Sequence, residues 1–130
     1  MQDLLHLAQR MMLHAYAPYS KFHVGAALRA EDGSLHGGCN VENAAYPQGT
    51  CAEAGAIAAM VSAGHKRILE CLVVGPGPHV ITPCGGCRQK LREFGASDLA
   101  IHVCDEHGTV RRSFSLSELL PQSFGPENLQ

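Results

Sequence analysis

Three of the six cysteines occupy positions from which they could bind one metal ion. Cys84 and Cys87 have two residues between them, in the sequence PCGGC, at the start of a predicted helix that ends at Phe94. Cys51 begins another predicted helix, which continues to Ala63. Two thiolates on one helical turn point the same way, and a third from a neighbouring helix completes three corners of a tetrahedron. Zinc sites with three protein ligands keep the fourth position for water, which is the catalytic arrangement.

The other three cysteines lie in different settings. Cys39 and Cys71 fall in predicted strands and Cys104 ends a third strand, so we interpret them as small buried hydrophobic residues. No obvious fourth sulfur ligand remains. Three thiolates leave the zinc site with a net negative charge, which the positive ends of two helix dipoles partly offset. The sequence therefore favours a zinc ion with an open position over a closed structural site.

Glu53 follows Cys51 by two residues and shares its helical turn. A carboxylate there can take a proton from a zinc-bound water and deliver it to the substrate. This combination can hydrolyse the C–NH₂ group of an amidine-like ring. A C-x-E segment followed by P-C-x-x-C matches the signature of zinc enzymes that remove an amino group from a nucleobase.

Each half of this pattern also has a simpler interpretation. Thr50 and Glu53 could form a capping box that only satisfies the start of the helix. Thr82 could be an N-cap followed by Pro83 at the first helical position. A single C-x-x-C pair could be a redox pair or half of a structural zinc site. The two halves together, both at helix starts, favour the catalytic zinc site.

The elements that must position these residues alternate between helices and strands. Apolar residues at helical spacing predict a first helix that Pro18 ends, and Asp-Gly between two apolar runs predicts a hairpin. The predicted strands cover Val24–Ala30, Leu35–Val41, Leu69–Gly75, Leu99–Cys104 and Thr109–Phe114, with a helical turn over Ser115–Leu120.

Strand–helix–strand units need parallel pairing with right-handed crossovers, whereas hairpins need antiparallel pairing. We therefore expect an α/β fold, a three-layer α/β/α arrangement with a mixed, roughly five-stranded sheet. A chain of 130 residues is expected to form a single domain over residues 1–130.

Composition narrows the class of protein. Charged residues make up 17% of the chain and the net charge is −2, with the ten basic residues scattered, which argues against a nucleic-acid polymer as partner. We see no signal peptide and no run long enough to span a membrane. We therefore expect a cytoplasmic protein whose cysteines are thiols.

Five segments of the sequence, in this order along the chain, resemble those of the small homotetrameric cytidine deaminases, and the resemblance covers nearly the whole chain. The matching segments are Tyr19–Ala27, Gly38–Pro47, Cys51–Glu53, Pro83–Gln89, and the closing Leu119–Pro121 with Phe124–Pro126. The resemblance implies one Zn²⁺ per chain on Cys51, Cys84 and Cys87, with Glu53 as the proton shuttle. It implies hydrolysis of free cytidine or 2′-deoxycytidine by attack of zinc hydroxide at C4.

The resemblance also implies a set of substrate contacts. Phe22 would pack on the pyrimidine ring, while Asn40 and Glu42 would bind the ribose hydroxyl. The remaining contacts would be the Ala52 N–H and the Pro83 carbonyl on the base edge, and Ala44, Tyr46 and Phe124 at the site of a neighbouring subunit in the homotetramer.

The residue types alone leave other roles open for these positions. Phe22 could belong to the core, Asn40 could be a turn residue, and Glu42 could simply be solvated. Tyr46 could shape a loop, and Phe124 could dock on any apolar surface.

Two residues depart from the family pattern. His23 stands where many relatives have proline, and we interpret it as a packing or solvated residue. Relatives commonly carry arginine after the catalytic glutamate, where this chain has Ala54. Losing that cation should make the thiolates more electron-rich, so the expected effect is on zinc retention or pH dependence. Arg88, on the second predicted zinc helix, is a candidate to compensate.

Three other functions compete with this interpretation. A deaminase of aminonucleoside antibiotics shares the zinc segments, although the 40–42 segment and the Phe124 tail weigh against it. A polynucleotide deaminase would need a basic surface. A non-catalytic zinc domain would not need Glu53.

Overall fold

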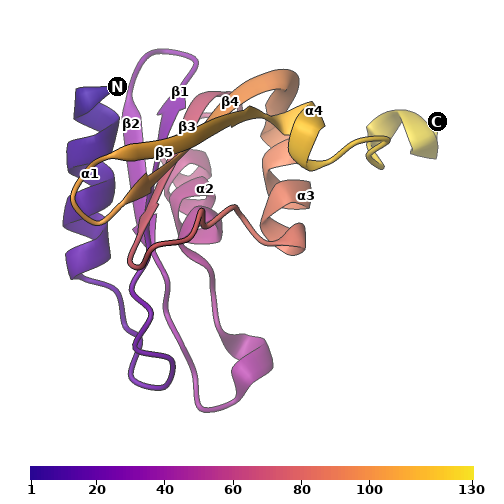
Figure 1. Ribbon diagram of the computed structural model, residues 1–130. Helices are drawn as coiled ribbons and strands as arrows, with labels where there is room; N and C mark the ends of the chain where they lie inside the picture. The colour runs from indigo at the N-terminus through magenta and orange to yellow at the C-terminus, as the bar shows by residue number, and fades with distance from the viewer.

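The computed structural model describes residues 1–130 and contains one five-stranded sheet in the order β2-β1-β3-β4-β5. The elements are α1 (Gln2–Leu13), β1 (Gly25–Ala30), β2 (Leu35–Cys39), η1 (Tyr46–Gln48), α2 (Ala52–Ser62), β3 (Ile68–Gly75), α3 (Gly85–Phe94), β4 (Gly95–Asp105), β5 (Val110–Ser115), α4 (Leu116–Leu119) and η2 (Pro126–Leu129). Figure 1 shows their arrangement.

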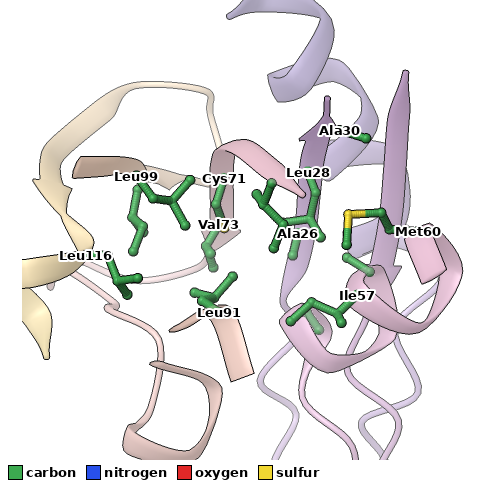
Figure 2. Packing of buried hydrophobic residues seen from close by; sticks show 14 of the residues in the cluster. Ala26, Leu28, Ala30, Ile57, Met60, Cys71, Val73, Leu91, Leu99 and Leu116 are labelled. Atoms are coloured by element: carbon green, nitrogen blue, oxygen red, sulfur yellow. The ribbon is translucent and has the colours of Figure 1, made fainter. Parts of the chain in front are cut away.

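Helices cover both faces of the sheet, which confirms the expected three-layer α/β/α fold. On one face Ala26 and Leu28 of β1 and Val73 of β3 pack against residues of α2 and α3, among them Met60 and Leu91 (Figure 2). On the other face α1 packs on the alternate residues of the same strands; the buried set there is Leu4, Leu5, Ala8, Ala27, Leu72, Val74 and Cys104. The alternation of a strand thus separates two hydrophobic layers.

The sheet is mixed, as predicted. β1 pairs antiparallel with both β2 and β3, so β2 and β3 run in the same direction, and β3 pairs parallel with β4. The carboxyl ends of β2 and β3 therefore lie at the same edge of the sheet. The chain enters α2 after β2 and α3 after β3, so both helices begin near that edge, which is the lower edge in Figure 1.

Glycine allows α2 to lie directly on β2. A Cβ atom added at Gly38 would overlap the backbone of Ala56 in α2. The contact is therefore backbone against backbone, and it fixes the height of α2 above the sheet. Since Cys51 and Glu53 open this helix, the same contact fixes their height.

Several predicted boundaries were wrong. The first helix ends at Leu13 rather than at Pro18, because Tyr16 leaves it to form a bridge with Val41. β2 ends at Cys39, since Val41 pairs outside the sheet with Tyr16 and Thr50. β4 begins at Gly95, directly after α3 and four residues earlier than predicted.

Candidate metal centre and active site

The three predicted zinc ligands lie together at the starts of two helices. Cys51 is the N-cap residue of α2, Cys84 is the N-cap residue of α3, and Cys87 lies on the first turn of α3. Their three sulfur atoms lie within 4.8 Å of one another, and the sulfur atoms of Cys51 and Cys84 are 3.8 Å apart. Tetrahedral zinc with Zn–S bonds of about 2.3 Å places its sulfur ligands about 3.8 Å apart. The donor set therefore fits zinc.

The three thiols differ in acidity. A hydrogen bond from the backbone N–H of Cys87 lowers the pKa of the Cys84 thiol. Burial raises the pKa of the Cys51 and Cys87 thiols. Zinc binds thiolates, and burial makes this form less favourable for Cys51 and Cys87. The backbone N–H of Cys87 favours the thiolate form of Cys84.

Glu53 lies beside this cluster on the first turn of α2, and only 5% of its surface is exposed. Burial raises the pKa of its carboxyl group, because the charged form loses its water. The capping box with Thr50 does not form: Cys51 is the N-cap residue, and Thr50 pairs with Val41. The Glu53 carboxyl group is therefore available for chemistry.

The start of α3 also lacks the simple threonine N-cap that the sequence allowed. Cys84, not Thr82, is the N-cap residue of α3. The hydroxyl group of Thr82 instead accepts a hydrogen bond from the guanidinium group of Arg88 at 2.8 Å. Arg88 also donates to the carbonyl groups of Pro83, at 2.7 Å, and Leu119, at 2.8 Å. Its N–H groups are thus directed to these oxygens and not to the sulfur atoms.

Asn40 and Glu42 hold the segment between α1 and β1. The Asn40 side chain accepts from the N–H of Val24 at 2.9 Å and donates to the Phe22 carbonyl at 2.7 Å. One oxygen of Glu42 accepts from the N–H groups of Tyr19 and Ser20, each at 3.0 Å, and the other accepts from the Ser20 hydroxyl. Neither residue is simply solvated.

A pocket of about 390 Å³ opens between this segment and the loop after β2. Its lining is Tyr19, Ser20, Glu42, Asn43, Tyr46 and Gly49. The rings of Tyr19 and Tyr46 meet edge to face, with centroids 6.1 Å apart. The pocket contains two of the predicted substrate residues, Glu42 and Tyr46, but its walls include none of the three cysteines.

The predicted aromatic contacts are on the surface. Phe22 is 40% exposed, Tyr46 is 77% exposed and Phe124 is 56% exposed, so Phe22 is not a core residue. Ala44 is exposed in the same loop as Tyr46. These four residues lie outside the buried layers of this chain.

The C-terminal segment is bound to α3 through residues 123, 124 and 127. Gln89 donates to the Phe124 carbonyl at 3.0 Å. Arg92 donates to the Ser123 hydroxyl at 2.9 Å and forms an ion pair with Glu127 at 2.5 Å. Polar contacts therefore hold the tail that carries Phe124.

Sequence reasoning missed the parts that Ser20, Thr82 and the Arg88 side chain play. Ser20 and Arg88 lie inside the segments that resemble the family, but their types gave no indication of their partners. Ser20 binds the Glu42 carboxylate, and Arg88 binds the Thr82 hydroxyl and two backbone carbonyls. No spacing in the sequence reveals these contacts.

Comparison with known proteins decides the family. The cytidine and deoxycytidylate deaminase zinc-binding region matches residues 1–103, which include all three cysteines and Glu53. The chain belongs to the cytidine deaminase family. Membership makes it a zinc-dependent enzyme, and Cys51, Cys84 and Cys87 form the group that can hold the ion.

Individual cytidine deaminases are similar over most of their length. The cytidine deaminase of Sporosarcina psychrophila is 38% identical over 98% of this chain and 93% of its own. That of Mycobacterium tuberculosis is 44% identical over 88% of this chain and 82% of its own. The crystal structure of the cytidine deaminase from Burkholderia pseudomallei superimposes with a TM-score of 0.88 at 41% identity, covering 95% of this chain and 98% of that one.

The helices of this cytidine deaminase family member are too short, or not apolar enough, to cross a membrane. All six cysteines are free thiols. Of the three outside the metal centre, Cys71 and Cys104 are buried and Cys39 is half-buried.

Proposed function

We propose that this enzyme hydrolyses cytidine and 2′-deoxycytidine to uridine and 2′-deoxyuridine, with release of ammonia, as a step of pyrimidine salvage. The observation that carries the proposal is the buried carboxyl group of Glu53 on the same helical turn as Cys51. The names of the similar proteins, cytidine deaminases, support the choice of substrate.

Glu53 would move the protons of the reaction. Zinc, when bound, supplies the activation of the water that adds to C4 of the base. Glu53 takes the proton from this water, passes it to N3 and then assists departure of the amino group as ammonia. The upward direction of its pKa suits this task, because burial favours the protonated form from which a carboxyl group can donate.

The backbone at the two helix starts would recognise the base. The N–H of Ala52 belongs to the first turn of α2, where N–H groups have no partner within the helix, so it can donate to the base edge. The Pro83 carbonyl accepts one hydrogen bond from Arg88 and retains a second lone pair for the amino group of the base.

The 19–24 segment and the loop after β2 would bind the rest of the nucleoside. The exposed face of Phe22 can pack on the flat pyrimidine ring. Asn40 and Glu42 would bind the ribose hydroxyl with the hydrogen-bonding capacity that remains after they hold Phe22 and Ser20.

We further propose that the enzyme is a homotetramer of the cytoplasm. Ala44, Tyr46 and Phe124 are exposed on this chain, as residues that complete a neighbour's site must be. Reduced cysteines, which a cytoplasmic location provides, are the form in which the metal centre can bind zinc.

The test is the loss of the ultraviolet band of cytidine on mixing with the zinc-loaded enzyme. We expect turnover by the unchanged enzyme and a loss of about 10²- to 10⁴-fold in kcat for Glu53→Gln, which keeps the shape of the side chain but cannot move the proton. The zinc content and circular dichroism of the variant serve as controls.

Other outcomes would contradict the proposal. Undiminished turnover by Glu53→Gln would refute the proton shuttle. No turnover of cytidine by folded, zinc-loaded protein would lead first to aminonucleoside antibiotics as substrates, and next to a non-catalytic nucleoside-binding role.

A further inference from the structure

Arg88 follows the metal ligand Cys87 in α3 and donates to three oxygen atoms. Two of them, the Thr82 hydroxyl and the Pro83 carbonyl, belong to the residues directly before Cys84. The third is the carbonyl of Leu119, the last residue of α4. One side chain therefore connects the entry to the metal-binding helix with a different part of the chain.

The segment that leads into α3 buries Pro83 but has few backbone hydrogen bonds to hold it. Between the end of β3 and Cys84, residues 76–83 form no backbone–backbone hydrogen bond. Two arginine side chains bind its carbonyl groups: Arg111 binds Gly77 at 3.2 Å, and Arg88 binds Pro83 at 2.7 Å. The Arg88 contacts are at the end that carries Cys84.

The helix start itself lacks a side-chain cap. Cys84 occupies the N-cap position with a thiol in place of the oxygen side chain of a usual cap, and its sulfur lies 3.8 Å from that of Cys51. Thr82, which has the side chain of a good cap, is engaged by Arg88. The position of Cys84 therefore depends on what fixes Thr82 and Pro83.

We propose that Arg88 is a positioning residue of the metal centre, which holds the Thr82–Pro83 entry against α4 and so keeps Cys84 at the correct distance from Cys51. A guanidinium group suits this role, because its planar array of donors can serve three acceptors at fixed angles, whereas an ammonium group is a single point of charge. Bonds from a charged donor are also stronger than neutral ones. The inference goes beyond the proposed function, since it concerns metal retention and needs no substrate.

The experiment measures how fast the purified holoenzyme releases zinc to the chromogenic chelator 4-(2-pyridylazo)resorcinol. Loss of an outer contact of a metal ligand costs about 10- to 100-fold in metal affinity, so we expect Arg88→Met to release zinc faster by a factor in that range. Thr82→Val removes one of the three acceptors and should give a smaller increase. Arg88→Lys keeps the charge but not the planar array. Its rate of zinc release should therefore lie between those of the unchanged enzyme and Arg88→Met.

Lys90→Met is the matched control. Lys90 is an exposed cation on the same helix and forms no hydrogen bond or ion pair, so its removal changes the charge of α3 without the three contacts. Its zinc release should equal that of the unchanged enzyme. The thermal unfolding midpoint of every variant is measured alongside, so that a general loss of stability is recognised.

Three results would overturn the proposal. The first is zinc release by folded Arg88→Met at the rate of the unchanged enzyme. The second is zinc release by Arg88→Lys as slow as that of the unchanged enzyme, which would show that the charge at position 88, and not the planar array, retains the metal. If Arg88→Met fails to fold, unchanged rates in both Thr82→Val and Arg88→Lys would be the third. None of these measurements uses cytidine, so they stand apart from any failure of the proposed reaction.

Discussion

Two glutamates predicted to act in the site have opposite surroundings. Glu53 is buried on the first turn of α2, which raises the pKa of its carboxyl group. Glu42 is held by the hydroxyl and N–H of Ser20 and the N–H of Tyr19, which lower the pKa of its carboxyl group. Burial thus favours the neutral form of one carboxyl group, and hydrogen bonds favour the charged form of the other.

Acid should release the segment that Glu42 holds. Because its pKa in the folded protein lies below the usual 4.5, its contribution to order is complete above that value and is lost as pH falls through the lowered pKa. We expect the amide resonances of Tyr19 and Ser20 to shift together when nuclear magnetic resonance spectra are recorded at decreasing pH.

Glu42→Gln provides the control for this titration. The amide has no charge to lose, so the two resonances should already differ from those of the unchanged enzyme at neutral pH and should lack the acid transition. Resonances of the unchanged enzyme that stay constant while Glu42 becomes protonated would contradict the assignment.

At the scale of elements, the position of α2 depends on Gly38. A Cβ atom at this position would overlap the backbone of Ala56, so Gly38→Ala must push α2 away from β2. Overpacking of this kind costs about 1–3 kcal/mol, and here it would also displace Cys51. We expect a lower free energy of unfolding in urea together with faster release of zinc.

Gly55→Ala is the matched substitution from the helix side of the same interface. There a Cβ atom would lie 3.6 Å from the Cys39 carbonyl oxygen, which is an ordinary contact. Alanine favours a helix over glycine by about 1 kcal/mol, so this variant should be as stable as the unchanged enzyme or more so. Equal stability of both variants would contradict the tight contact at Gly38.

The elements themselves could be predicted where local chemistry dominates. The hairpin turn contains Asp32-Gly33, and Gly33 has the positive φ of 86° that such a turn requires. The ends of α1 and β2 could not be predicted, because Tyr16, Val41 and Thr50 pair with one another across the chain. Long-range pairing of this kind has no local signal.

In the candidate site, too, some features could be predicted from the sequence and others could not. Cys51, Cys84, Cys87 and Glu53 could be found because their spacing around two helix starts is itself the chemical signature. The preference of Thr50 and Thr82 for caps was misleading, since the N-cap positions belong to the two cysteines. Metal binding competes with capping for the same helix ends, and only the structure shows which prevails.

At the scale of the whole molecule, the exposed aromatic residues suggest shared sites. Phe124 is carried by a tail that Gln89 and Arg92 hold on α3, so its backbone is fixed while more than half of the residue stays exposed. If Phe124 completes a neighbour's site, Phe124→Ala should raise KM for cytidine without changing zinc content. Steady-state kinetics and metal analysis of the same preparation test this.

Mixed oligomers distinguish a neighbour's site from the chain's own. Subunits of Glu53→Gln retain Phe124, and subunits of Phe124→Ala retain Glu53. Unfolding and refolding the two together should create sites that combine an intact Glu53 with an intact Phe124, and activity should exceed the sum of the separate variants. Strictly additive activity would assign Phe124 to its own subunit.

The two ends of the chain are unequal as points of attachment. Residues 123, 124 and 127 of the C-terminal segment bind α3 through Gln89 and Arg92, whereas the N-terminus begins α1 on the other face of the sheet (Figure 1). A fusion partner or surface linker joined at Gln130 would pull on the helix that carries two of the three sulfur ligands. One joined at Met1 would pull on a helix that carries none, so immobilisation of a working catalyst should use the N-terminus.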